Sequence, residues 1–209
     1  MPMREWDVQA EIDRRHDGEA LPSEHAVRIL LMGLTTEHDR EMPSWEETWA
    51  NTPRRYVNAL TELLTREEFQ FTTFEKPTGL DELIAMTGIR FAALCAHHML
   101  PFVGTAHVAY VPQGKVAGLS KLARTVRYYS KGLWIQEDLT DQIADRLITE
   151  LSPMGCAVVL QAEHLCYTIR GVTAPGTITT TSAMRGCFLD PTKQARHEFF
   201  ELIKIASQR

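Results

Sequence analysis

The stretch that decides the fold runs from residue 88 to residue 112 and reads GIRFAALCAHHMLPFVGTAHVAYVP. Apolar and β-branched residues fill its two ends, residues 88–95 and 104–112, and predict two β-strands. Between them lie one cysteine and two histidines in the order Cys95-Ala96-His97-His98. Pro101 follows and indicates that a regular element ends nearby. A thiol and two imidazoles are therefore expected where the backbone turns.

Similar short runs continue to the end of the chain, and amphipathic segments interrupt them. Further strands are expected at residues 115–118, 157–163, 165–172 and 177–184, with Gln113-Gly114 as the turn of a hairpin. Helices are expected at residues 119–126, with Ser120 as N-cap, at 139–151, and from Asp190-Pro191 onward. This order predicts an α+β domain with an antiparallel sheet over residues 85–209.

The first 84 residues have the pattern of helices. Apolar positions from Ala26 to Gly33 follow helical spacing, with Ser23 and Glu24 as plausible starting residues. Residues 41–53 are expected to form a loop, and Pro53 suits the first position of the next helix. We therefore expect a helical N-terminal appendage over residues 1–84.

Composition and charge exclude several classes of protein. The chain has 209 residues, 44% hydrophobic and 23% charged, and no apolar run approaches the roughly 20 residues that span a membrane. Residues 1–84 hold 18 acidic and 9 basic side chains, and residues 85–209 hold 9 and 13, a smaller positive excess than duplex-binding domains carry. Four cysteines and an N-terminus without a signal-peptide pattern lead us to expect a cytoplasmic protein with no membrane or nucleic-acid partner.

A second cluster of cysteine and histidine makes a metal site the favoured interpretation. Taken alone, Cys95 beside two histidines suits a buried core as well as a metal. In the strand expected at residues 165–172, however, His164 and Cys166 would face one side, with Arg170 on the same face. Thiolate and imidazole together suit zinc, and a set of three protein ligands is the catalytic pattern. The two remaining histidines would serve acid–base chemistry.

Two further features suit a nucleotide, although each also has an ordinary structural explanation. Ser120, Lys121 and Arg124 lie at the predicted start of a helix, where backbone N–H groups attract anions, yet such residues are common on solvated helix faces. Gln136-Glu137 offers a carboxylate that matches the paired N–H donors of guanine, although a glutamate there also suits the helix dipole.

In combination these motifs resemble the GTP cyclohydrolase I family. The resemblance rests on CAHHMLPFVG at residues 95–104, GLSKLAR at 118–124, QEDLT at 136–140 and HLCYTIRGV at 164–172. It covers about residues 85–204 in order, and a looser likeness surrounds NTPRR at residues 51–55. It implies conversion of GTP to 7,8-dihydroneopterin triphosphate with release of formate, a first step toward tetrahydrofolate, other pterins or deazaguanines.

The resemblance also implies a role for each candidate residue. Cys95, His98 and Cys166 would bind zinc (Zn²⁺), and His97 and His164 would transfer protons. Gln136 and Glu137 would contact guanine, and the triphosphate would be held by Ser120, Lys121, Arg124 and Arg170. The implied architecture is a tunnelling fold, an antiparallel sheet with two helices on one face, assembled as a toroidal homodecamer with active sites at subunit boundaries.

Two positions depart from the family pattern, and other functions remain open. Ala96 replaces a usual glutamate, and Gln161-Ala162-Glu163-His164 replaces Glu-Ala-Thr-His. Neither change removes an expected ligand or base. The alternatives are a non-catalytic GTP-binding homologue and a structural zinc module. A zinc-dependent deaminase is disfavoured because the sequence lacks its His-x-Glu and Pro-Cys-x-x-Cys motifs.

Overall fold

A computed structural model describes residues 22–190, 192 and 194–208, and the chain forms two compact units. The first unit comprises residues 1–62 and the second residues 63–209. The second unit includes residues 63–84, which the sequence places in the helical appendage. The cysteine and histidine motifs all lie in this second unit.

The described part of the first unit is helical. It contains α2 (Pro22–Leu34), α3 (Glu37–Arg40) and most of α4 (Trp45–Leu64). The expectations of a loop at residues 41–53 and of a helix starting at Pro53 are wrong, because α4 already begins at Trp45. Proline lacks the N–H that would bond to the carbonyl of Trp49. Nη1 of Arg28 donates to the Trp49 oxygen instead, at 2.6 Å, so the helix continues through Pro53 while the Trp49 carbonyl keeps a hydrogen-bond partner.

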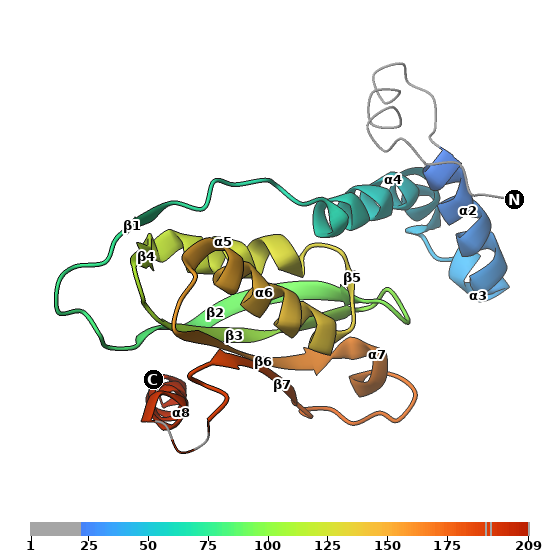
Figure 1. The fold of residues 1–209 in the computed structure, drawn as a ribbon. Helices are drawn as coiled ribbons and strands as arrows, with labels where there is room; N and C mark the ends of the chain where they lie inside the picture. Colours follow the sequence, from blue (N-terminus) through green and yellow to red (C-terminus); the bar gives the residue numbers. More distant parts are fainter. Residues whose placement is uncertain (1–21, 191, 193, 209) are drawn as a thin grey trace, which may run out of the picture. The chain divides into compact units, whose positions relative to one another are not determined.

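The second unit contains seven strands and four helices within the described residues. The strands are β1 (Thr73–Glu75), β2 (Ile84–Cys95), β3 (Pro101–Val111), β4 (Lys115–Ala117), β5 (Leu133–Trp134), β6 (Gly155–His164) and β7 (Thr179–Gly186). The helices are α5 (Leu119–Ser130), α6 (Gln136–Leu151), α7 (Leu165–Thr168) and α8 (Gln194–Ser207). The α+β class is thereby confirmed (Figure 1).

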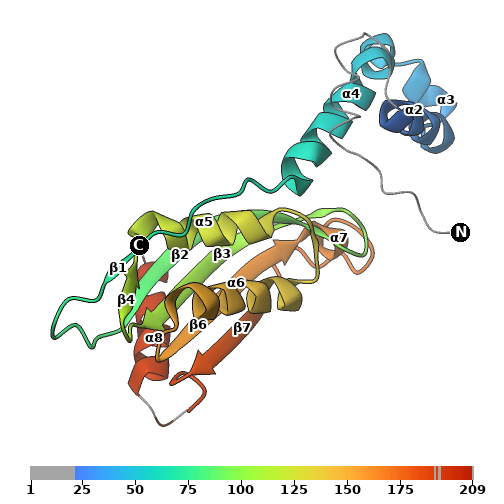
Figure 2. The ribbon, with the colours of Figure 1, turned by 45° about the horizontal axis from the view of Figure 1, so that its top comes forward.

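The main sheet is mixed, with strand order β5-β2-β3-β6-β7. Its four long strands are antiparallel (Figure 2). The short edge strand β5 runs parallel to its neighbour β2. A bulge between Met86 and Ile89 interrupts the β2–β3 ladder, and Gly88 supplies the φ of 77° found there. Register places Cys95, at the end of β2, opposite Trp134 of β5.

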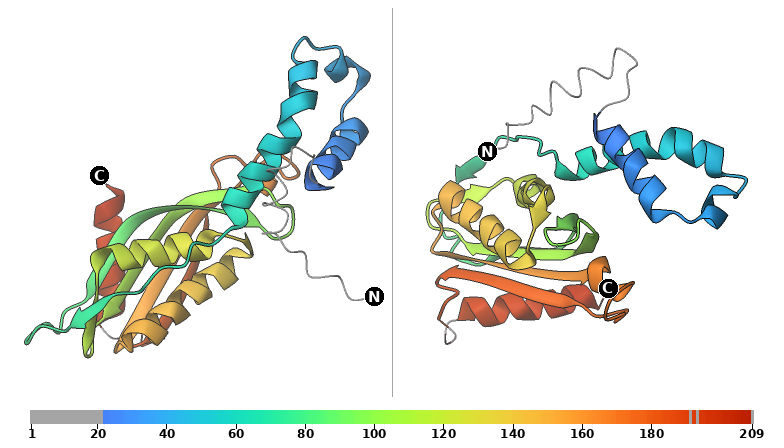
Figure 3. Two further views of the ribbon diagram at one scale, coloured as in Figure 1. Left: turned by 90° about the horizontal axis from the view of Figure 1, so that it is seen from above. Right: turned by 90° about the vertical axis from the view of Figure 1, so that its right-hand side faces the viewer.

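Helices cover both faces of this sheet (Figure 3). Helices α5 and α6 pack on one face over a core that includes Phe102, Leu122 and Ile143. Helix α8 packs on the other face, where Phe199 and Ile203 join a smaller apolar cluster. The two helices on one face agree with the expected arrangement, and α8 adds a third layer.

Several local expectations are wrong. Gln113-Gly114 does not close a hairpin, because β4 pairs with β1 in a separate two-stranded sheet. The N-cap of α5 is Gly118, so Ser120 lies within the first turn. Residues 165–172 form the one-turn helix α7 and turns instead of a strand. Helix α8 begins at Gln194, whereas the expected start included Pro191, which lies outside the described residues.

Candidate metal and nucleotide site

Three expected metal ligands converge at one end of the main sheet. The ligand atoms of Cys95, His98 and Cys166 all lie within 4.8 Å of one another. Cys95 is 5% exposed, whereas His98 is exposed. In a tetrahedral zinc site, thiolate sulfurs about 2.3 Å from the ion lie roughly 3.5–4 Å apart, so this group is compact enough to hold one ion.

A tight turn after β2 brings His98 back toward Cys95. The backbone N–H of Met99 donates to the carbonyl of Cys95 at 2.8 Å, and the N–H of Cys95 donates to the carbonyl of Leu100 at 2.9 Å. Met99 adopts a positive φ of 54°, which closes this turn. Because the backbone reverses here, Cys95 and His98 come close enough to hold one ion between them.

The third ligand is delivered by a helix, not by a strand. Strand β6 ends at His164, and Cys166 lies in the one-turn helix α7 that follows. The expectation that His164, Cys166 and Arg170 share one face of a strand is therefore wrong. Arg170 lies beyond α7, and its Nη1 donates to the carbonyl of Cys166 at 3.3 Å. The change from strand to helix after His164 therefore places the histidine and Cys166 on different elements.

His164 is held between two aromatic rings. Its imidazole stacks on Phe102, with ring centroids 4.5 Å apart and planes 1° from parallel. Tyr167 lies with its centroid 6.0 Å away and its plane at 17°. Nε2 of His164 lies 2.7 Å from Oε1 of Gln136. The plane of this ring and the position of one of its nitrogens are thus both fixed.

Burial changes the proton affinity of two groups in the site. It lowers the pKa of His164, although the carboxylate of Glu137 opposes this effect. Burial also raises the pKa of Cys166, with the neighbouring Cys95 thiol acting in the same direction. A neutral imidazole that can accept a proton therefore lies beside a pair of thiols.

The remaining candidates on this side of the sheet differ in accessibility. His97 is exposed, and its Nδ1 lies 3.9 Å from the sulfur of Cys95. Glu137 is exposed at the start of α6, where it acts electrostatically on His164. The Gln136 side chain, in contrast, is only 2% exposed and points into the protein. Its polar atoms already have protein partners, so its side chain does not face a guanine from solution.

Two of the expected phosphate-binding residues lie at the end of α5 that is remote from the metal ligands. Cys95 pairs with Trp134, which follows the carboxyl end of α5, while the start of α5 at Gly118 bonds to the carbonyl of Thr72. Helix α5 joins these two ends (Figure 1), and its 12 residues separate them by about 18 Å. Ser120 and Lys121, in the first turn, therefore do not join the metal ligands within one chain, and Arg124 lies midway along the helix.

Sequence reasoning missed the groups that surround His164. Phe102 faces His164 across the β3–β6 pair, and Thr181 reaches the Gln136 side chain from β7. Of these groups, Thr140 could have been predicted to lie near Gln136, because residues four apart share a helix face. The other contacts join distant parts of the chain.

The fold and the site define an α+β protein with a candidate metal centre of two thiols and one imidazole. The sequence profile of GTP cyclohydrolase I matches residues 24–204. Over 179 residues, the chain is 44% identical to GTP cyclohydrolase 1 of Aquifex aeolicus, covering 86% of this chain and 94% of that protein. The chain belongs to the GTP cyclohydrolase I family.

Two other relatives agree with this assignment. GTP cyclohydrolase 1 of Hydrogenobaculum sp. is 46% identical over 178 residues, covering 85% of this chain and 94% of that protein. The protein of the same name from Brucella suis is 39% identical over 202 residues, covering 94% and 92%. Within the described residues, no helix is long and apolar enough to cross a membrane.

Proposed function

We propose that this protein hydrolyses GTP at the imidazole ring of its base and rearranges the product to 7,8-dihydroneopterin triphosphate, releasing formate. The observation that carries the proposal is the convergence of Cys95, His98 and Cys166 next to His164. Family membership supports the same reaction, since the curated relatives named above are called GTP cyclohydrolase 1. The product would enter a folate, pterin or deazaguanine pathway in the cytoplasm.

The three converging residues fit zinc. Two thiols and an imidazole are soft to borderline ligands, which favour zinc over magnesium or calcium. Three protein ligands leave a coordination position for water, as in catalytic zinc sites. Bound zinc lowers the pKa of such a water to near neutrality and so supplies the hydrolytic nucleophile.

The two histidines outside the ligand set would move protons. Burial lowers the pKa of His164 and so favours its neutral form, which is the form that can accept a proton. His97 is exposed beside the Cys95 sulfur, where it can exchange protons with solvent and with the opened ring. Ring opening and ribose rearrangement both require such transfers at nitrogen and oxygen atoms.

Recognition of the base would fall to Glu137. Its carboxylate accepts two hydrogen bonds from the adjacent N1–H and N2–H donors of guanine, an arrangement that adenine lacks. The contribution of Gln136 to guanine would come from its backbone N–H, at the first position of α6, because its side chain is buried. Arg170, beyond α7, would bind phosphate.

A complete site would need a second copy of the chain. Ser120, Lys121 and Arg124 carry the expected triphosphate contacts, yet Ser120 and Lys121 lie at the end of α5 that is remote from Cys95. A neighbouring subunit that places its α5 against this end would complete the site. The expected tunnelling-fold barrel and toroidal homodecamer provide such neighbours.

The decisive experiment incubates purified, zinc-loaded protein with GTP. Formate release and the fluorescence of the oxidised pterin product are measured together. The proposal requires both signals in equal amounts. A non-catalytic GTP-binding homologue would bind GTP but release no formate. A structural zinc module would neither bind GTP nor release formate.

A further inference from the structure

The buried amide of Gln136 has more partners than any other side chain near the metal ligands in the described structure. Its Nε2 lies 3.2 Å from the carbonyl oxygen of Leu160, 3.1 Å from that of Thr179 and 3.0 Å from Oγ1 of Thr181. Its Oε1 lies 2.7 Å from Nε2 of His164. A glutamine this well bonded is held in one orientation.

The partners decide which end of the amide faces His164. Carbonyl oxygens only accept hydrogen bonds, so the NH₂ group must point toward Leu160 and Thr179. Oε1 is thereby turned to His164, and it also only accepts. Nε2 of His164 must therefore carry the hydrogen, which leaves Nδ1 of the neutral ring with a free lone pair.

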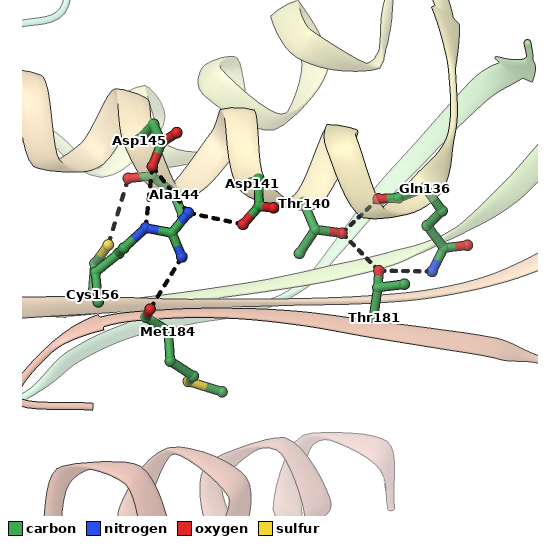
Figure 4. A network of polar contacts seen from close by, with 9 residues as sticks. Gln136, Thr140, Asp141, Ala144, Asp145, Cys156, Thr181 and Met184 are labelled. Carbon is green, nitrogen blue, oxygen red and sulfur yellow. Dashed lines mark hydrogen bonds and ion pairs between the residues drawn. The ribbon is translucent and has the colours of Figure 1, made fainter. Parts of the chain in front are cut away.

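Two threonine hydroxyls lie next to Gln136, one against its side-chain amide and one against its backbone carbonyl (Figure 4). Oγ1 of Thr140 donates to the carbonyl of Gln136 at 2.7 Å and lies 2.6 Å from Oγ1 of Thr181. Because the Thr140 hydrogen is used, Thr181 donates to Thr140. Oγ1 of Thr181 therefore only accepts on its other side, and it shares the two hydrogens of the Gln136 NH₂ group with the two carbonyl oxygens. All three groups around Nε2 thus act as acceptors, and an amide oxygen in this position would meet no donor.

We propose that Gln136 is a positioning residue that fixes the Nε2–H tautomer of His164 and thereby presents Nδ1 as the proton acceptor. The Phe102 and Tyr167 rings fix the plane of the imidazole, and the amide fixes its rotation within that plane. This inference rests on the proposed function, because it assigns His164 to proton transfer. It replaces the expected side-chain contact of Gln136 with guanine.

Kinetics separate the two roles of Gln136. In Gln136→Met, which keeps length but loses both polar ends, kcat for formate release should fall about 10- to 100-fold while KM for GTP stays within about twofold. A guanine contact would instead raise KM and leave kcat unchanged. That result, or an unchanged kcat, overturns the inference.

A second pair of variants tests the same chain of hydrogen bonds from its far end. Thr181→Val removes the hydroxyl that holds the amide and should lower kcat several-fold, whereas Thr181→Ser keeps the hydroxyl and should restore it. Thr149→Val is the control for loss of a threonine hydroxyl, because Thr149 lies on the same helix as Gln136 and its hydroxyl bonds within that helix, to the carbonyl of Asp145. These variants decide the matter if Gln136→Met does not fold. Equal activity of Thr181→Val and Thr181→Ser counts against the inference.

A spectroscopic measurement reads the tautomer without substrate. Solid-state ¹⁵N spectra of histidine-labelled protein, with His164→Asn to assign the signal, should show Nε2–H in the wild type and a mixture of tautomers in Gln136→Met. An Nδ1–H tautomer in a wild type that releases formate overturns the inference alone. A wild type with the Nε2–H tautomer but no formate release overturns the proposed function and leaves the positioning role supported.

Discussion

The imidazole of His164 lies flat against the ring of Phe102, with 4.5 Å between centroids and 1° between planes. The two residues are directly opposed across the antiparallel β3–β6 pair. Phe102 is the second residue of β3, and His164 is the last residue of β6. Stacking at this position partly buries the histidine where β6 ends and α7 begins. The sheet thereby orients the proposed acid–base group, whereas the three candidate ligands lie at the end of β2, in the turn after it and in α7.

Loss of either histidine should separate chemistry from metal binding. His164→Ala and His97→Ala should each lower turnover by roughly 10²–10⁴, the usual contribution of a positioned acid or base. Zinc content, measured on the same preparations, should not change. A variant that keeps near-normal turnover would show that its histidine only supports the site.

Metal binding should depend on each of the three converging residues. Cys95→Ser, His98→Ala and Cys166→Ser should each abolish the binding of one zinc per chain, because a three-ligand site has no spare ligand. Cys187→Ser is the matched control, since Cys187 lies outside this group, and it should retain zinc. Elemental analysis checks the set. Full occupancy in Cys166→Ser would contradict the assignment.

Glu137 should select guanine. Glu137→Gln replaces one acceptor oxygen with a donor that faces the N–H groups of the base, so kcat/KM for GTP should fall by about 10²-fold or more while the fold is retained. Kinetics with GTP, ITP and ATP measure this selection. The exposed Asp138 beside it provides a control, and Asp138→Asn should change these constants less than about twofold.

Mixed assemblies should reveal sites shared between copies. Arg124→Ala and His98→Ala should each be nearly inactive alone, because one lacks a phosphate contact and the other a metal ligand. Subunits of the two variants assembled together should recover part of the activity, since some sites would then combine an intact α5 with an intact metal centre. Coexpression followed by formate assay tests this. Activity no higher than that of the separate variants would mean that each site comes from one chain.

Stability should fall as the pH drops because of His107. This residue is 3% exposed, and burial lowers its pKa below the ordinary value of 6.5, although a hydrogen bond with Gln161 opposes the shift. Below about pH 6.5 the unfolded chain therefore binds a proton that the folded protein excludes, and folding stability decreases until the folded pKa is passed.

The contribution of His107 can be isolated by substitution. Between pH about 7.5 and about 5.5, Tm of the wild type should fall more than Tm of His107→Phe, which has no group to titrate. Scanning calorimetry at the two pH values measures the difference. His164 shifts in the same direction and remains in both proteins, so its effect cancels. Equal falls in Tm would rule out a role for His107.

Local patterns were sufficient for the α+β class and for most strands of the main sheet. Alternating and helical spacing predicted β2, β3, α5 and α6, because these elements bury one face against a common core. The two clusters of cysteine and histidine predicted the group of Cys95, His98 and Cys166 that could hold a metal. Pro53 shows where such reasoning fails, since Arg28, 21 residues before Trp49, bonds to the Trp49 carbonyl that the proline leaves without a helix partner.

Only the tertiary structure decided how the site residues are distributed. Cys166 lies on a helix because β6 stops pairing with its neighbouring strands at His164. The sequence around His164 does not show where this pairing ends. The tautomer of His164 depends on Gln136, which is oriented by Leu160, Thr179 and Thr181. The functional groups that the protein possesses can be identified from the sequence alone, because each motif is a short run of neighbouring residues. Contacts between distant segments determined which of those groups meet, since they depend on the packing of the whole sheet.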